Sequence, residues 1–152
     1  MSESDPTIDE VLAQPGLDLD AFTKEDAVDL GLVVVSTIRE RDANLAVRIV
    51  LDGDIVFQAK LKNTGPQNDE WLAGKAVTVA LTGEPSLLAR LRGVTPEAPA
   101  GHDGPAPRLF GGSIPIRVNG EIVGTLTTSG EKDFVDHAVG VESIRRYLAA
   151  RA

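Results

Sequence analysis

Residues 111–130 read Gly-Gly-Ser-Ile-Pro-Ile-Arg-Val-Asn-Gly-Glu-Ile-Val-Gly-Thr-Leu-Thr-Thr-Ser-Gly, and Asn119-Gly120 divides them into two runs of alternating character. An Asn-Gly pair between two such runs predicts a β-hairpin. A two-residue turn would mix apolar and polar residues on both faces. A three-residue loop, with Gly120 left-handed in a bulge, would pair Ile116 with Ile122 and separate the faces. Because register follows the buried face, we expect the three-residue loop.

A second hairpin is predicted over residues 45–61 by the same kind of alternation, with its turn at Asp52-Gly53. A three-residue loop there would place Ile49 opposite Ile55 on one face. The two hairpin sequences resemble each other only briefly. We therefore attribute the likeness to identical turn chemistry used twice rather than to an internal duplication.

The first long helix is predicted from residue 24 to about residue 41. Thr23 followed by Asp26 is typical of a capping box at a helix N-terminus. The spacing of apolar residues indicates a buried stripe that consists of Ala27, Leu30, Gly31, Val34 and Ile38. Other apolar residues lie outside the faces assigned inward, namely Leu32, Val33, Val35 and, in the central hairpin, Val123. Because such patches usually mark contacts, we expect a homo-oligomer, a dimer at least, with this helix in its interface.

Further helices are expected after Asn68, ending at Gly83, then after Pro85, and finally over residues 133–150. The order helix, hairpin, helices, hairpin, helix predicts an α+β domain. Its sheet would have four to five antiparallel strands, with the helices packed on them. Because Pro115 lacks an amide hydrogen, its strand is expected to lie at an edge or to be interrupted there.

Length and composition fit one domain. The chain has 152 residues, of which 42% are hydrophobic, and this suffices for a single core. Residues 1–30 hold nine acidic side chains and one lysine, and so carry the whole formal net charge of −8. We assign residues 1–19 to an acidic N-terminal segment and residues 20–152 to a single domain. A Pro/Gly-rich stretch at residues 94–108 is expected to be a mobile surface loop.

Composition also argues against several function classes. The chain has no cysteine, so neither disulfides nor thiolate chemistry contribute. An acidic N-terminal segment argues against nucleic acid and anionic membranes as partners. The absence of a long apolar run and of a basic, then apolar, N-terminus predicts a cytoplasmic protein. The two histidines belong to no recognisable hydrolase motif or zinc site.

Over residues 17–150, the order and spacing of one set of residues match a known family: Asn68, Trp71, Lys75, Ser86, Phe110-Gly111-Gly112, Pro115, Gly124, Ser129-Gly130 and Asp136-His137. On these positions the chain resembles the UPF0303 family, within the wider group of haem-binding-protein-S-like (HbpS-like), GlcG-like and PduO C-terminal-like domains. The resemblance implies a profilin-like sheet backed by helices, in proteins that associate with themselves.

The resemblance also has implications for function. Relatives include haem binders, and the domain is often labelled haem-degrading. One eukaryotic UPF0303 member is associated with the chaperone machinery that delivers tail-anchored proteins. The chain departs from the family at two places, with Gly74-Lys75 where Arg-Lys is usual and Pro85-Ser86 where two serines are usual. An anion site built on that arginine or that first serine is weakened here.

Three residues around the start of the predicted helix after Asn68 are candidates for binding. Lys75 lies one helical turn after Trp71, where it can hold a carboxylate or phosphate against an apolar wall. Alternatively, Lys75 extends along the helix edge to solvent or reaches a neighbouring subunit. Asn68 stands where a helix cap is needed, and a cap is the alternative to a ligand-binding role.

Gly111-Gly112 and Ser129-Gly130 bracket the central hairpin and place bare backbone at both its ends. Backbone amides near a helix N-terminus can receive an anion, although chain geometry alone can also require these glycines. His137 lies in the first turn of the last predicted helix, where the macrodipole keeps its ring neutral and able to bind a metal or haem iron. The alternative is a partly buried packing residue. The other side chains of the usual iron-ligand types are Met1, His102 and Tyr147.

These observations predict an oligomeric small-ligand-binding module, with haem or another tetrapyrrole as the candidate ligand and His137 as the candidate iron ligand. The other candidate binding residues are Asn68, Trp71, Lys75, Ser86, Gly111, Gly112, Ser129 and Gly130. The alternative is a protein-interaction or scaffold protein associated with chaperone-type partners. Whether the chain catalyses a reaction is left open. The aromatic content of 4% argues against haem, because few rings are available to enclose a porphyrin.

Overall fold

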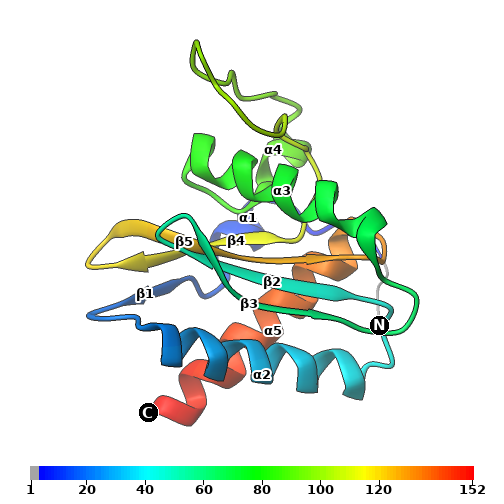
Figure 1. Ribbon diagram of the computed structural model, residues 1–152, viewed down its shortest axis with the longest axis vertical. Coiled ribbons are helices and arrows are strands. Elements are labelled where there is room, and N and C mark those ends of the chain that lie inside the picture. The colour runs from blue at the N-terminus through cyan, green and yellow to red at the C-terminus, as the bar shows by residue number, and fades with distance from the viewer. Residues whose placement is uncertain (1–3) are drawn as a thin grey trace.

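The computed structural model describes residues 4–152, which form a sheet with helices on both faces (Figure 1). The sheet has the strand order β1-β4-β5-β2-β3. Its strands are β1 (Leu17–Leu19), β2 (Ala46–Leu51), β3 (Asp54–Lys60), β4 (Ser113–Val118) and β5 (Glu121–Ser129). Only the β1–β4 pair is parallel. The predicted α+β fold is therefore confirmed, and the sheet is antiparallel, as predicted, except for this one pair.

The helices occupy both faces of this sheet. They are α1 (Ile8–Leu12), α2 (Lys24–Glu40), the 3-10 helix η1 (Pro66–Asn68), α3 (Asp69–Thr82), α4 (Ser86–Arg92) and α5 (Asp133–Arg151). Figure 1 shows α2 and α5 below the sheet and α3 and α4 above it. The capping box of α2 is present as predicted, with Oγ1 of Thr23 accepting the amide of Asp26 at 3.1 Å.

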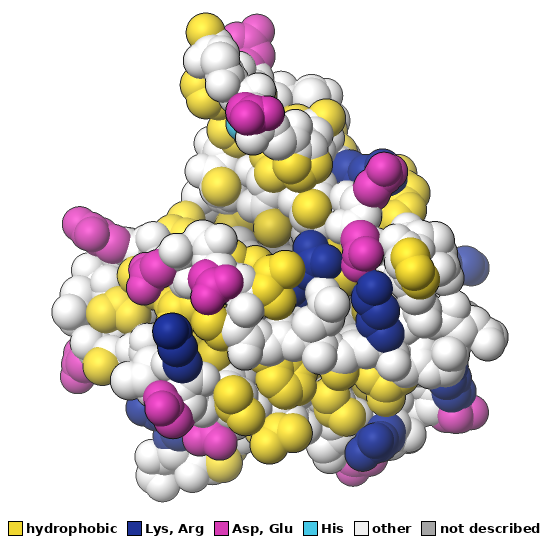
Figure 2. Space-filling model, in the orientation of Figure 1, with side chains coloured by type: hydrophobic (Ala, Val, Ile, Leu, Met, Phe, Trp, Pro, Cys, Tyr) yellow, Lys and Arg dark blue, Asp and Glu magenta, His cyan; other side chains and the backbone are white. Residues whose placement is uncertain are grey.

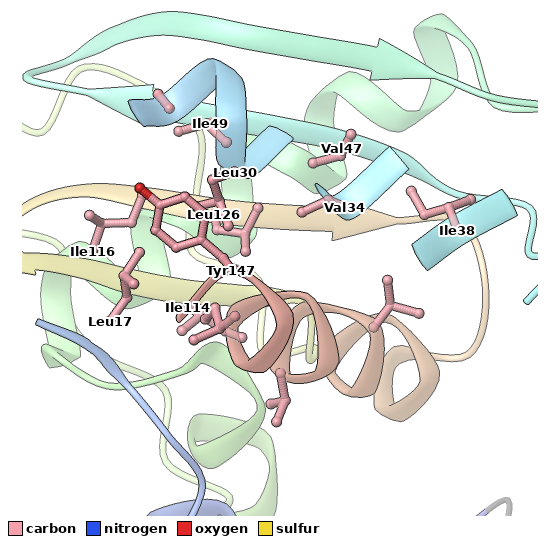
Figure 3. Close-up of a cluster of buried hydrophobic side chains, with 14 of the residues drawn as sticks. Leu17, Leu30, Val34, Ile38, Val47, Ile49, Ile114, Ile116, Leu126 and Tyr147 are labelled. Carbon is pink, nitrogen blue, oxygen red and sulfur yellow. The ribbon is translucent and has the colours of Figure 1, made fainter. Parts of the chain in front are cut away.

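The main core lies between the sheet and the α2–α5 layer (Figure 3). All members of the stripe predicted for α2 are buried. Leu30, Val34 and Ile38 of α2 point toward inward side chains of β2, β4 and β5, which are Val47, Ile49, Ile114, Ile116 and Leu126. Gly31 matters here because a Cβ at this position would lie 2.4 Å from the ring of Phe57. The glycine thus lets α2 approach β3 closely.

Both hairpins turn in two residues, so the predicted three-residue loops are wrong. Val118 lies opposite Glu121 across a turn in which Asn119 and Gly120 have φ values of 50° and 84°. The bulge lies farther along the hairpin, where β5 leaves Val123 without a partner between two paired residues. That extra residue restores the apolar alternation deeper in the sheet, and it turns Val123 toward the core rather than to the face predicted for it.

The β2–β3 hairpin repeats this arrangement. Asp52 and Gly53 form the turn with φ values of 52° and 79°, and β3 leaves Val56 without a partner. As a result, Ile49 lies opposite Phe57 rather than Ile55. Both hairpins thus have the same kind of turn and carry their bulge at the same distance from it, and this accounts for the likeness of their sequences.

The strand that contains Pro115 is not an edge strand. β4 lies between β1 and β5, but β1 begins to pair only at Ile116, where it meets Leu17. Pro115 therefore lies just outside the parallel pairing, where no amide hydrogen is needed. β1 was not predicted, because its three residues are too few to show a periodic pattern.

The described part of the acidic N-terminal segment packs on the rest of the chain. Leu17 is buried in the core, and Val11 of α1 packs on Leu87 and Leu88 of α4. Residues 94–108 contain no helix or strand and project beyond α4 (Figure 1). Within residues 4–152, no helix combines the length and apolar character needed to cross a membrane.

Candidate functional site

A cavity of about 670 Å³ opens beside the start of α3, the end of β5 and the start of α5. Its lining comes from the N-terminal segment, η1, α3, α4, the residue stretch before β4, and the β5–α5 connection. The lining residues used below are Asp5, Asn68, Trp71, Lys75, Arg90, Phe110, Ser129, Gly130, Lys132, Asp133, Phe134 and Asp136. Five of the predicted site residues thus lie together, namely Asn68, Trp71, Lys75, Ser129 and Gly130.

One wall of the cavity is aromatic. The ring of Trp71 meets the ring of Phe110 edge to face, with centroids 5.0 Å apart. The guanidinium of Arg108 lies 4.1 Å from the centroid of the Trp71 ring. Gly74 makes room for this arrangement, because a Cβ there would lie 2.5 Å from Cγ of Arg108. The Trp71 ring therefore contacts both a cation and a second ring, and both contacts stabilise its position.

Beneath this wall lies a buried ion pair. Lys75 is 2% exposed, and its Nζ donates to Oδ2 of Asp136 at 2.9 Å and to the carbonyl of Thr128 at 2.9 Å. The Asp136 carboxylate also accepts the amide of Glu131 at 3.0 Å. Burial raises the pKa of Asp136 to about 6, against the lowering by Lys75 and by the backbone amides. Neither of the alternatives considered for Lys75, an exposed edge position or a subunit contact, fits this burial.

Asn68 occupies the position before α3 but makes no side-chain cap bond. Its Oδ1 instead accepts the amide of Gly65 at 2.9 Å, and its Nδ2 donates to the carbonyl and Oγ of Ser129, both at 3.4 Å. The cap expectation is therefore wrong. Because η1 precedes α3, the side chain turns back to join η1 to the end of β5.

Ser86, Gly111 and Gly112, which were also predicted as site residues, do not line the cavity. Oγ of Ser86 accepts the amide of Ser113 at 3.0 Å, and the amide of Gly111 donates to Oδ2 of Asp133 at 2.9 Å. Gly112 and Gly130 have φ values of 136° and 148°. The backbone conformation thus requires glycine at both positions. This favours a structural role for Gly111-Gly112 and Ser129-Gly130 over an anion site.

His137 does not line this cavity. It is 2% exposed under the N-terminal segment, where its Nε2 donates to Oε1 of Gln14 at 2.6 Å. Its Nδ1 has no hydrogen-bond partner among residues 4–152. His102 lies in the exposed loop, and Tyr147 is buried against Phe22. The cavity therefore receives no histidine or tyrosine from the described chain, and His137 lies instead beside two other cavities, of about 260 and 490 Å³.

Comparison with known proteins now gives the family. Residues 22–145 match the sequence model of the family described as "Haem degrading protein HbpS-like". The chain belongs to this HbpS-like family. It is 37% identical over 132 residues to a UPF0303 protein of Streptomyces coelicolor, with 84% of each chain covered. A UPF0303 protein of Streptomyces avermitilis is 36% identical over 149 residues, which cover 94% of this chain and 91% of the relative.

Solved structures share the fold of this HbpS-like protein. The crystal structure of Ybr137w has a TM-score of 0.74 at 27% identity, over 86% of this chain and 80% of that one. The structure of a PduOC:Heme complex has a TM-score of 0.65 at 20% identity, over 82% and 94% of the two chains. The structure of HbpS gives 0.63 at 21% identity, over 98% and 99%. The last two likenesses show the fold alone.

Sequence reasoning missed Arg90 and its two carboxylate partners in the cavity of this HbpS-like protein. Nε of Arg90 lies 2.5 Å from Oδ2 of Asp133, and its Nη2 lies 2.5 Å from Oδ1 of Asp5. Asp133 and Asp5 lie 43 and 85 positions from Arg90 in the chain. No local pattern indicates such a cluster, since only the packing of α1 on α4 and the turn into α5 bring it together.

The burial of His137 predicts a pH dependence of stability. Desolvation lowers its pKa to about 4 from an ordinary value of 6.5, so the unfolded chain takes up a proton first as the pH falls. The stability that the chain has with His137 neutral is fully present above pH 6.5. As the pH falls from 6.5 toward 4, the free energy of unfolding decreases by at most about 1.4 kcal/mol per pH unit because of this residue. We expect His137→Gln to show a shallower fall in unfolding free energy between pH 6.5 and 4.5 in urea titrations. An unchanged slope would contradict this assignment.

Proposed function

We propose that this HbpS-like protein is a small-ligand-binding module and that the cavity beside Trp71 is its binding site. The observation that carries the proposal is an aromatic wall of Trp71 and Phe110 above a buried charged pair, in a cavity of about 670 Å³. Concave sites with apolar walls and a few fixed polar groups are typical of ligand pockets. The family name and the haem complex of one structural neighbour favour haem or another tetrapyrrole as the ligand.

The residues of the cavity fit a porphyrin ring but do not fit haem iron ligation by His137. Trp71, Phe110 and Phe134 supply ring surface, whereas the described lining contains no histidine, cysteine, methionine or tyrosine. The Nε2 of His137 is already bonded to Gln14, away from this cavity. We therefore propose that the ring and its acidic substituents are recognised, and that iron is not ligated by the side chains lining the cavity.

Titration with haemin and with iron-free protoporphyrin IX tests this proposal. Trp71 is the only tryptophan, so quenching of its fluorescence reports binding at the cavity. We expect the two porphyrins to bind with dissociation constants within about threefold, and Phe110→Ala to weaken both by about tenfold through loss of a ring contact. His137→Gln is the matched control and should bind both as the parent does. Absence of porphyrin binding would reject the tetrapyrrole assignment, and a requirement for iron together with His137 would restore the iron-ligand hypothesis.

We also propose that the protein is a closed homo-oligomer, a dimer at least, with α2 in the interface. Apolar side chains gather over α2 and β3 on the face shown in Figure 2, and among them Val28, Leu32 and Ile55 are exposed. The outer edge of β3 has no neighbouring strand in the described chain, which adds unpaired backbone groups to this face. By contrast, Val33 and Val35 pack partly on the core of the same chain.

Light scattering tests the assembly. Leu32 is 57% exposed, so Leu32→Glu should dissociate the oligomer and leave the circular dichroism spectrum unchanged. Val94→Glu, in the projecting loop, is a matched control that should leave the mass unaltered. A parent protein with the mass of one subunit would reject the proposal.

A further inference from the structure

The guanidinium of Arg90 presents two edges, and each holds a carboxylate. Its Nε and Nη2 donate to Asp133 at 2.5 and 3.1 Å. Its Nη1 and Nη2 donate to Asp5 at 3.1 and 2.5 Å. Arginine binds carboxylates in this paired geometry more specifically than other side chains do. All three residues line the cavity beside Trp71.

The two carboxylates differ in how firmly they are held. The side chain of Asp133 is 14% exposed, belongs to α5 and also accepts the amide of Gly111. The side chain of Asp5 is 43% exposed and lies before α1, in a stretch without helix or strand. Asp133 is therefore a fixed partner of Arg90, whereas Asp5 is an exchangeable one.

The chain after Asp5 is anchored without the Asp5–Arg90 pair. The capping box of Thr7 starts α1, Val11 packs on α4, and Gln14 is bonded to His137. Release of Asp5 therefore leaves the contacts of α1 and Gln14 in place. Because α1 packs on the helix that carries Arg90, the released carboxylate stays close to it, at an effective concentration on the order of millimolar.

From this geometry we propose that Asp5 is a built-in competitor for the ligand, and that the edge of Arg90 which it occupies recognises a carboxylate on an apolar ring. The inference rests on the proposed binding site and names the chemical class of its ligand. A ligand carboxylate on this edge would make the same two hydrogen bonds as Asp5. Its ring would face Trp71 and Phe110, and Lys132 supplies a second cation in the lining.

The experiment compares an acid with its neutral analogue. Binding of 1-naphthaleneacetate and of 1-naphthaleneacetamide is measured by calorimetry for the parent, Asp5→Asn and the control Asp9→Asn. Asp9 carries the same charge within α1 but has no bond to Arg90. We expect Asp5→Asn to tighten binding of the acid about fivefold, because a larger fraction of molecules has the Arg90 edge free. Binding of the amide should not change, and Asp9→Asn should behave as the parent.

The outcomes separate this inference from the proposed function. Equal affinity of the parent and Asp5→Asn for the acid would overturn the competitor role and leave the binding site standing. A tighter acid complex of Asp5→Asn without any porphyrin binding would support the competitor role and reject only the tetrapyrrole. Failure of Asp5→Asn to bind either the acid or a porphyrin would overturn both. Arg90→Gln provides a second check, since it should abolish the preference for the acid over the amide.

Discussion

Replacing Lys75 by Met is expected to lower the free energy of unfolding by about 3–5 kcal/mol, because it leaves a buried carboxylate without its counter-ion. Asp136 is 1% exposed, and it would keep only backbone amide donors after the change. Urea unfolding at pH 7, followed by circular dichroism, measures the loss. The difference from the parent should narrow as the pH falls, since Asp136 in the variant takes up a proton in the folded state more readily than when unfolded.

The double variant Lys75→Met, Asp136→Leu is the control for this interpretation. Removing both partners also removes the uncompensated charge, so about half of the lost stability should return. Recovery stays incomplete because the amide of Glu131 and the carbonyl of Thr128 lose their partners. A single variant that loses less than about 1 kcal/mol would show that water reaches the carboxylate after the change.

Features of the fold that depend on neighbours in sequence could be predicted. The start of α2 follows from Thr23 and Asp26, which satisfy each other's backbone amides without help from the rest of the chain. The positions of the two hairpin turns follow from Asn-Gly and Asp-Gly, although the predicted loop length of three residues is wrong. The register could not be predicted, because an unpartnered residue such as Val123 shifts the alternation at a point that the turn does not determine.

In the candidate site, too, contacts between neighbours in sequence could be predicted and contacts between distant residues could not. Trp71 and Lys75 lie one turn apart on α3, so their common position follows from helix geometry. The sequence indicates Asp136 only as the neighbour of His137, and the pairing of Asp136 with Lys75 depends on how α5 packs against β5. His137 is buried on α5, but Gln14, the residue bonded to its ring, lies 123 positions earlier in the chain. Contacts of this kind arise from tertiary packing alone.

Replacing Gly130 by Ala is expected to lower the free energy of unfolding by at least about 3 kcal/mol, because two effects add at this position. Its φ of 148° is a conformation that residues with a Cβ rarely adopt, and a Cβ there would lie 2.2 Å from the carbonyl oxygen of Asn44. The clash is with backbone, so no side chain can turn aside to relieve it. Gly130 directly precedes Glu131, whose amide donates to the carboxylate of Asp136. A shift of this backbone would move a group that lines the cavity, so the variant should also weaken ligand binding there.

Two other glycines separate the effect of backbone strain from the effect of the clash with Asn44. Gly120 has a φ of 84° with open space around its Cβ position, so Gly120→Ala should lower stability by only about 1 kcal/mol from backbone strain. Gly16 has open space and no positive φ, so Gly16→Ala should leave stability within about 0.5 kcal/mol of the parent. Urea unfolding of the three variants gives the ranking. If Gly130→Ala proved no worse than Gly120→Ala, the connection between β5 and α5 would have to shift away from Asn44, and the cavity would not be held as rigidly as we infer.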